Sequence, residues 1–155
     1  MPNKLDSNNL YYSYDIRNIH FVSVNSEIPF ESQFDDAYIK KFTTWLENDL
    51  QKSTKRWKVL YLHRPFYCSQ TSSDYHCGTS STKMRNLYEE IIYKAKVDFV
   101  LAGHVHAYER LYPIYNGTAD MDSVNTNGTI YINPKYPTYV VCGTGGNVEG
   151  YYNCK

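Results

Sequence analysis

The sequence predicts an α/β domain built around parallel strands, and two observations carry this prediction. Short apolar runs at residues 57–62 and 97–102 are typical of strands buried on both faces of a sheet, and a segment with helical apolar periodicity, residues 81–96, separates them. A strand, a helix and a second strand in this order form a right-handed βαβ unit with parallel strands. The chain has 155 residues, an ordinary length for one domain.

The elements before this unit follow from the same patterns. Residues 11–24 are rich in β-branched and aromatic side chains and break in the middle, which predicts a β-hairpin. Apolar residues then recur at helical spacing in residues 35–50, and either Ser32 or Asp35 can cap the N-terminus of that helix. The strand that follows the helix must end before Pro65, because a proline cannot continue the ladder of hydrogen bonds.

The chain changes character beyond the βαβ unit. Loops rich in Gly, Asn and Thr dominate there, with short strands expected at residues 129–132 and 138–141. We therefore predict a boundary that separates a main domain, residues 1–110, from a β-rich C-terminal region, residues 111–155.

The charge balance argues against two classes of partner. Lys plus Arg number 16 and Asp plus Glu number 16, so the formal net charge is zero, whereas general nucleic-acid and membrane-surface binders need a basic face. No apolar stretch approaches the roughly 18 residues of a membrane span, and residues 1–30 lack the hydrophobic region of a signal peptide. We expect neither nucleic acid nor a membrane among the partners.

The cysteines and two sequons indicate the compartment. The four cysteines fall into two local pairs, Cys68 with Cys77 and Cys142 with Cys154. Two Asn-Gly-Thr sequons, at Asn116 and Asn127, lie in a segment with the composition of a surface loop. Together these features favour a glycosylated protein of the secretory route with disulfide bonds, although the missing signal peptide conflicts with this interpretation. Four unrelated thiols are the alternative, and the second pair could equally bond to cysteines elsewhere.

Histidines follow the two parallel strands of the βαβ unit. His63 comes directly after the first strand, and His104 and His106 come after the second. Because sites in open α/β sheets form beyond the carboxyl ends of the strands, we expect these imidazoles to converge and to bind a transition metal. In an extended chain His104 and His106 would share one face, whereas a tight turn would direct them to two ions. Ordinary hydrogen-bonded histidines are the alternative for each, and we interpret His20 in the first hairpin as structural.

Two longer motifs around these histidines resemble a known family. VLYLHRPFYCS, at residues 59–69, and FVLAGHVHAYER, at residues 99–110, are similar to the last two metal motifs of the purple acid phosphatases, which are calcineurin-like metallophosphoesterases. The resemblance covers about residues 11–150. It implies the C-terminal half of an αββα sandwich with a short β-rich extension, the main domain being the phosphoesterase part and the C-terminal region that of the purple acid phosphatases.

The resemblance also implies an activity and its metals. It implies acid-phosphatase-type hydrolysis of phosphate monoesters by a metal-activated hydroxide at a dinuclear site that holds Fe(3+) and a divalent Zn, Mn or Fe ion. His63 and His104 would bind the divalent ion, and His106 would bind the ferric ion. The substrates would be small-molecule phosphate esters, the location secreted, lysosomal or vacuolar, and a homodimer is compatible with the family.

The resemblance also implies roles for residues near these histidines. Cys68 and Cys77 resemble the disulfide of a loop that carries substrate-contacting histidines in some members, and His76 is the catalytic candidate in that loop. Arg64 and Tyr67 could contact the phosphate, with packing at the rim of the site as the alternative.

The motifs GDxG, GDxxY and GNH[DE], which supply the other ligands in the family, do not occur in the sequence. We therefore expect that the chain is part of a longer enzyme and is inactive by itself. Two alternatives stay open. One is an inactive, truncated, secreted paralogue, and the other is a phosphodiesterase or nucleotide pyrophosphatase on the same scaffold.

Overall fold

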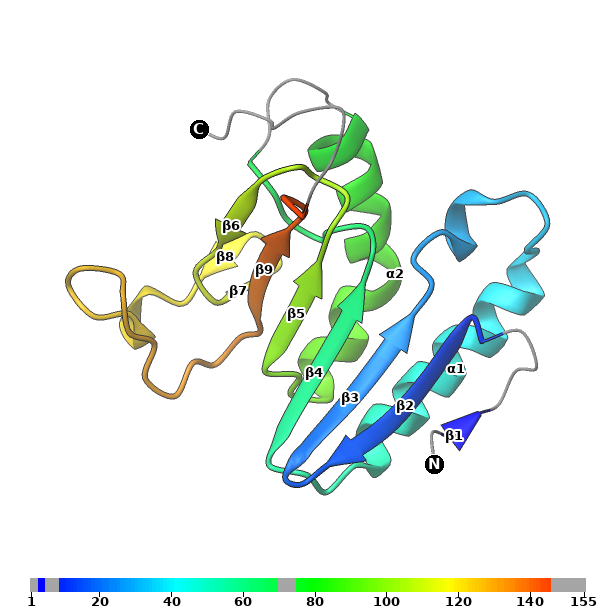
Figure 1. The fold of residues 1–155 in the computed structure, drawn as a ribbon, viewed down its shortest axis with the longest axis horizontal. Helices are drawn as coiled ribbons and strands as arrows, with labels where there is room; N and C mark the ends of the chain where they lie inside the picture. Colours follow the sequence, from blue (N-terminus) through cyan, green and yellow to red (C-terminus); the bar gives the residue numbers. More distant parts are fainter. Residues whose placement is uncertain (1–2, 5–8, 70–74, 146–155) are drawn as a thin grey trace.

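The computed structural model describes residues 3–4, 9–69 and 75–145. Within these residues the chain forms a seven-stranded mixed sheet with the strand order β1-β2-β3-β4-β5-β9-β6 (Figure 1). The strands of this sheet are β1 (Asn3–Lys4), β2 (Tyr11–Ile16), β3 (Ile19–Val24), β4 (Trp57–Leu62), β5 (Phe99–Ala102), β6 (Tyr108–Arg110) and β9 (Thr138–Cys142). This architecture confirms the predicted α/β class.

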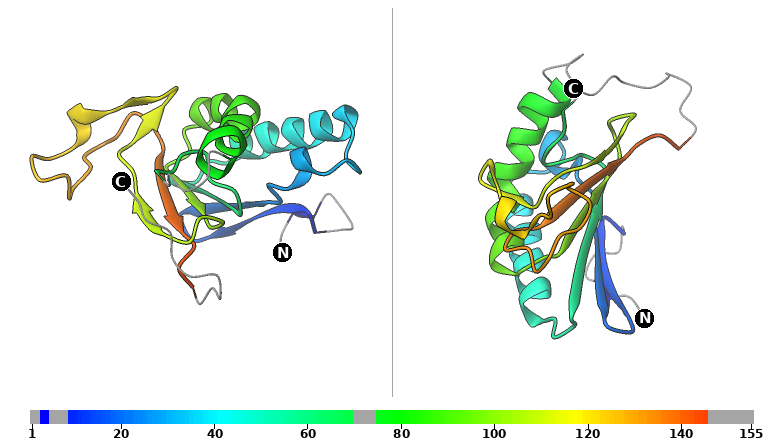
Figure 2. Two further views of the ribbon diagram at one scale, coloured as in Figure 1. Left: turned by 90° about the horizontal axis from the view of Figure 1, so that it is seen from above. Right: turned by 90° about the vertical axis from the view of Figure 1, so that its left-hand side faces the viewer.

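Two helices pack on one face of the sheet, as Figure 2 shows. They are α1 (Asp36–Lys52) and α2 (Ser81–Lys94), and the described part of the chain also has the short helices η1 (Ile28–Phe30), η2 (Tyr75–Ser80) and η3 (Met121–Ser123). Of the two candidate caps, Asp35 is the one at the N-terminus of α1, where its carboxylate accepts a hydrogen bond from the backbone N–H of Tyr38 at 2.8 Å. Neither α1 nor α2 has the length and apolar composition that crossing a membrane requires.

The predicted hairpin and βαβ unit are both present. β2 and β3 pair in antiparallel fashion, while β3, β4, β5 and β9 run parallel to one another. α2 connects β4 to β5 across the covered face. β9 comes from the predicted C-terminal region and lies between β5 and β6, so the two regions share one sheet. The division of the chain at residues 110 and 111 stays a prediction.

The prediction of a strand at residues 129–132 is wrong. Only an isolated bridge between Val124 and Tyr131 forms there. The side-chain oxygen of Asn125 accepts hydrogen bonds from the backbone N–H groups of Thr129 and Ile130, at 2.8 and 2.9 Å, so a local turn consumes the donors that a strand would use. Beside this segment lies a two-stranded ladder of β7 (Ile114–Tyr115) and β8 (Thr118–Ala119).

The core lies between the sheet and the two helices. The helices bury their apolar stripes there, Phe42, Leu46 and Leu50 from α1 and Met84, Tyr88 and Ile92 from α2. The inward-facing side chains of Val22, Leu60 and Val100 meet them from three neighbouring strands, each 1% exposed or less. This single cluster joins the hairpin, both helices and the parallel strands.

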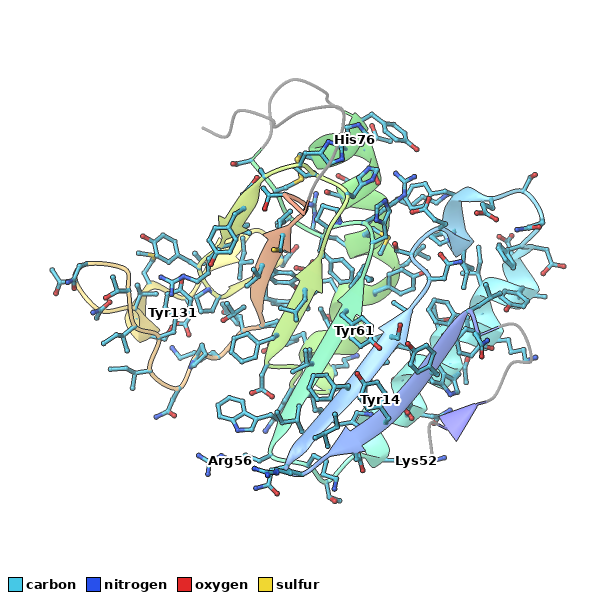
Figure 3. The ribbon with its side chains drawn as sticks, in the orientation of Figure 1. Tyr14, Lys52, Arg56, Tyr61, His76 and Tyr131 are labelled. Atoms are coloured by element: carbon cyan, nitrogen blue, oxygen red, sulfur yellow. A yellow bond between two sulfur atoms is a disulfide. The ribbon has the colours of Figure 1, made fainter. Side chains whose placement is uncertain are left out.

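The opposite face of the sheet is open, which corrects the expectation that β4 and β5 are buried on both faces. Trp57 is 41% exposed, and Phe99 and Leu101 are each 38% exposed, because neither helix lies on this side. Tyr14 and Tyr61, labelled in Figure 3, belong to the same face. The structure therefore has one helical layer and one sheet, two of the four layers of an αββα sandwich.

Candidate active site

The carboxyl ends of β4 and β5 bring two of the predicted histidines together. His104 Nδ1 lies 2.9 Å from His63 Nε2, and the two rings meet edge to face with centroids 4.7 Å apart. The backbone N–H of Gly103 donates to the carbonyl of His63 at 3.0 Å, which extends the pairing of the two strands to their last residues. Parallel strands end at the same edge of the sheet, and this is why residues so distant in sequence meet.

The chain turns tightly at His104. Its φ of 64° is in the left-handed region, which costs a non-glycine residue about 1–3 kcal/mol. The N–H of Val105 donates to the carbonyl of Gly103 at 2.7 Å, and that of Ala107 donates to Val105 at 2.8 Å. Of the two arrangements left open for the His-x-His segment, the chain adopts the tight turn. His106 lies near enough to His63 for the two rings to interact electrostatically.

His76 reaches the same cluster from η2. Its Nδ1 is 2.6 Å from His104 Nε2 (Figure 3). The predicted disulfide between Cys68 and Cys77 is present and ties η2 to the segment after β4. The structure thus brings together three imidazoles from three segments.

The hydrogen-bonding pattern of this cluster suits neutral rings. One proton between each pair of nitrogens is enough, with His76 donating to His104 and His104 donating to His63. Loss of solvent, together with the positive charge of Arg64, lowers the pKa of His104 to about 4. Loss of solvent also lowers the pKa of His63. His104 is therefore uncharged at mildly acidic pH.

Arg64 is held beside the histidines by the carboxylate of Glu27, a residue that the sequence analysis did not predict to be part of the site. Its guanidinium makes a bidentate ion pair with Glu27, with contacts of 2.7–2.9 Å, and packs over the ring of Phe30. The remaining edge of the guanidinium lies 3.4 Å from His104 Nε2. Glu27 follows β3, the parallel neighbour of β4. Its position after a parallel strand could therefore have predicted that it lies at the same edge of the sheet as His63.

Tyr67 contacts α2 and the β7–β8 turn. Its hydroxyl donates to the carboxylate of Glu89 and accepts from the N–H of Gly117 at 3.0 Å. Burial, together with the bond to Glu89, raises the pKa of Tyr67 to about 12. The hydroxyl of Tyr67 and most of the guanidinium of Arg64 are thus already engaged, and the predicted phosphate contacts of both residues stay predictions.

A second element supports the turn at the histidines. The end of β9 lies against it, where the N–H of Gly143 donates to the carbonyl of Ala107 at 3.1 Å. A Cβ atom on Gly143 would lie only 2.0 Å from the carbonyl oxygen of Val105. A glycine here was visible in the sequence, but the close approach that requires it was not.

The other predicted sites lie on the surface or outside the described residues. Asn116 and Asn127 are exposed, as glycosylation requires, and their modification stays a prediction. Cys142 is exposed at the end of β9, whereas Cys154 lies outside the described residues, so this pairing also stays a prediction.

The histidines have the chemistry of a transition-metal site but not yet its arrangement. Two imidazoles on one tetrahedral ion, each about 2.0–2.1 Å from it, would have nitrogens roughly 3.3 Å apart. The two contacts here are 2.9 and 2.6 Å, so the rings bond to one another instead. Among the described residues, no three side chains of His, Cys, Asp or Glu are grouped so that they could hold a metal ion. A dinuclear centre does not fit these residues as they stand.

Comparisons with known proteins place this chain in a family. The family model of the calcineurin-like phosphoesterases matches residues 3–108. Purple acid phosphatase 21 of Arabidopsis thaliana is 39% identical over 94% of the chain, and human acid phosphatase type 7 is 34% identical over 93%. These matches span 29% and 35% of the relatives, so the chain is about a third as long as they are.

A solved structure shares the fold of the chain. The structure of purple acid phosphatase PPD1 from yellow lupin matches 98% of the chain with a TM-score of 0.71, at 21% sequence identity and over 25% of the lupin chain. The matched family model includes His63, His104 and His106, and the structural match covers nearly the whole chain. The chain belongs to the calcineurin-like phosphoesterase family, and it resembles the purple acid phosphatases within that family.

Proposed function

We propose that the chain takes part in acid-phosphatase-type hydrolysis of phosphate monoesters with small-molecule substrates. Family membership supports phosphoester hydrolysis in general. The observation that carries the more specific proposal is the cluster of His63, His76 and His104 beyond the ends of β4 and β5, in a chain whose relatives are named acid phosphatases. The same relatives favour a secreted, lysosomal or vacuolar location.

The proposal includes a dinuclear metal site that needs more donors than this chain holds. His63 and His104 would bind a divalent Zn, Mn or Fe ion, and His106 would bind Fe(3+). Such ions stabilise the negative charge that develops on phosphate oxygens and make a bound water more acidic. We further propose that the chain alone is inactive, because its three histidines leave the site incomplete.

Two residues of this chain, His76 and Arg64, would contact the phosphate group of the substrate. His76 can hold a proton on a ring nitrogen next to His104, which suits contact with a phosphate oxygen. The edge of Arg64 that faces His104 and Ser80 is the part of the guanidinium that could reach a phosphate, since Glu27 occupies the rest. Residues 1–110 would then be the phosphoesterase domain, and residues 111–155 would brace it through β9 and Gly143.

The test uses the protein isolated from its natural source with an antibody against this chain. We expect hydrolysis of p-nitrophenyl phosphate in mild acid, with two metal ions per molecule by elemental analysis. In the same protein made recombinantly at its natural length, His104→Ala should remove the divalent ion and abolish hydrolysis, whereas His20→Gln, outside the cluster, should leave the metal content unchanged. Wild-type metal content in the His104→Ala protein, or a preference for bis(p-nitrophenyl) phosphate, would contradict the proposal.

A further inference from the structure

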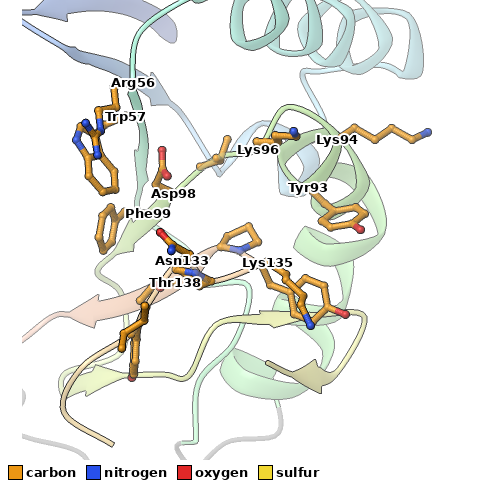
Figure 4. Close-up of a pocket in the computed structure, with 16 residues that line it drawn as sticks. Arg56, Trp57, Tyr93, Lys94, Lys96, Asp98, Phe99, Asn133, Lys135 and Thr138 are labelled. Atoms are coloured by element: carbon orange, nitrogen blue, oxygen red, sulfur yellow. The ribbon is translucent and has the colours of Figure 1, made fainter. Parts of the chain in front are cut away.

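A cavity of about 920 Å³ lies at the end of the sheet opposite to the histidines, and Trp57 and Phe99 form part of its wall (Figure 4). Both rings belong to the open face of the sheet, on which the other two layers of an αββα sandwich pack. Their exposure in this chain therefore does not indicate a ligand site. The start of α2, beside the histidines, differs from the cavity because its two serines are fully buried by residues that the structure describes.

The first of these serines, Ser80, does not cap the helix. A serine at the N-cap normally accepts a hydrogen bond from a backbone N–H of the first turn. The backbone of Ser80 is already helical, with φ −63° and ψ −51°, and its side chain makes no capping bond. Its hydroxyl instead accepts a hydrogen bond from the guanidinium of Arg64 at 3.3 Å. The side chain of Ser80 thus contacts the site and not the helix.

The second serine, Ser81, holds the backbone of His76. Its hydroxyl oxygen lies 2.9 Å from the carbonyl oxygen of His76 and 3.0 Å from that of Pro65, so the two carbonyl groups share one hydroxyl proton. The first contact follows from local structure, because η2 is a π-helical turn, in which residue i+5 pairs with residue i. The second contact joins η2 to the segment after β4, which the Cys68–Cys77 disulfide also joins to η2.

Burial makes the hydroxyl of Ser81 difficult to replace. The residue is 0% exposed, so water cannot reach the position of its hydroxyl. A buried carbonyl that loses its donor costs about 1–3 kcal/mol. Pro65 is buried, whereas His76 is only partly buried, so the backbone at His76 is the one that can move toward water when the hydroxyl is removed.

We propose that Ser81 is a positioning residue that sets the ring of His76 beside His104. It acts through the backbone of His76. Where the proposal concerns hydrolysis it rests on the proposed function, in which His76 contacts the phosphate. A displacement of about 1 Å can cost a factor of about 100 in rate, so removal of the hydroxyl should slow turnover.

Ser81→Ala tests the position of the ring in the 155-residue protein. Alanine is a better helix former than serine, so α2 should form in the variant. NMR spectra of the protein with isotopically labelled histidine report contacts between the His76 and His104 rings as nuclear Overhauser effects. We expect Ser81→Ala to lose these contacts. Ser123→Ala should keep them, although the hydroxyl of Ser123 is also buried and also donates to a backbone carbonyl, that of Asp120 at 3.0 Å.

Two results of this measurement would overturn the proposal. Unchanged ring contacts in Ser81→Ala would show that the hydroxyl does not position His76. Loss of contacts throughout the core would show that the hydroxyl supports the fold as a whole.

A double-mutant cycle tests the effect on turnover in the recombinant protein at its natural length, with p-nitrophenyl phosphate as the substrate. We expect Ser81→Ala to lower kcat at least tenfold in the wild-type background but less than twofold in the His76→Ala background, because both changes remove the same interaction. Ser123→Ala should change kcat by less than twofold.

Equal losses of kcat in the two backgrounds would overturn the proposal, since Ser81 would then act independently of His76. A wild-type protein without hydrolytic activity would instead contradict the proposed function, and the ring contacts measured by NMR would then decide whether Ser81 positions His76.

Discussion

Gly143 lies so close to Val105 that a Cβ atom at this position would be 2.0 Å from the carbonyl oxygen of Val105. The contact holds the end of β9 against the turn that carries His104 and His106. Since real Cβ atoms do not approach oxygen this closely, the backbone on one side must move when a side chain is added.

Gly143→Ala should therefore destabilise the protein and disturb the histidine turn. We expect the free energy of unfolding in urea to fall by about 1–3 kcal/mol, as for other overpacked positions. Gly145→Ala is the matched control, because among the described residues no atom beyond its chain neighbours lies within 4 Å of the corresponding Cβ. Equal stabilities of the two variants would contradict the assigned role of the contact.

Glu27→Gln should weaken the attachment of Arg64. The side chain of Arg64 is only 12% exposed and would keep its charge without its partner, so we expect a loss of about 1–3 kcal/mol in unfolding free energy. Glu47→Gln on the exposed side of α1 controls for the loss of one negative charge. A loss no larger than that of the control would show that the ion pair does not stabilise the fold.

His20 should make stability depend on pH. Its ring is 7% exposed and bonds to Asp15 and Asp49 at 2.8 and 2.9 Å. Burial by itself lowers the pKa of His20, but the two carboxylates outweigh this effect, so the pKa is raised above its usual 6.5. A raised pKa adds stability that is complete below pH 6.5 and is lost as the pH rises through the folded-state value.

The comparison of wild type with His20→Gln isolates this contribution, since all other groups titrate in both proteins. We expect the difference in unfolding free energy to be larger at pH 6 than at pH 9. A difference that grows with pH would mean that the imidazole is neutral in the folded protein.

Reduction of the Cys68–Cys77 disulfide should loosen the segment that carries His76. The chain-entropy model assigns about 2–3 kcal/mol to a loop of this length. We expect dithiothreitol to lower the unfolding free energy by this amount and to separate the His76 and His104 rings, which the ring-proton NMR signals report. The Cys68→Ser/Cys77→Ser double variant should resemble the reduced protein and should not respond to dithiothreitol. A reduced protein with unchanged stability and ring signals would contradict a role for the disulfide in positioning His76.

Several parts of the structure could be predicted because their cause is local. The helical spacing in residues 35–50 placed α1, and the break in residues 11–24 placed the turn between β2 and β3. The strands before Pro65 and Gly103 end where predicted, and this alone places His63 and His104 at one edge of the sheet. The prediction of a strand at residues 129–132 was wrong for an equally local reason, because the side-chain oxygen of Asn125 accepts hydrogen bonds from two of the backbone N–H groups there.

The sequence by itself determined the order of the elements, the parallel core and the histidines beyond its strand ends, because periodicities of 2 and 3.6 residues decide which side chains are buried. Only the tertiary structure decided that Glu27 engages Arg64, that Gly143 supports the histidine turn and that one face of the sheet is open. These contacts join residues about 40 positions apart, and their distances depend on strand register and loop path, which no local pattern encodes.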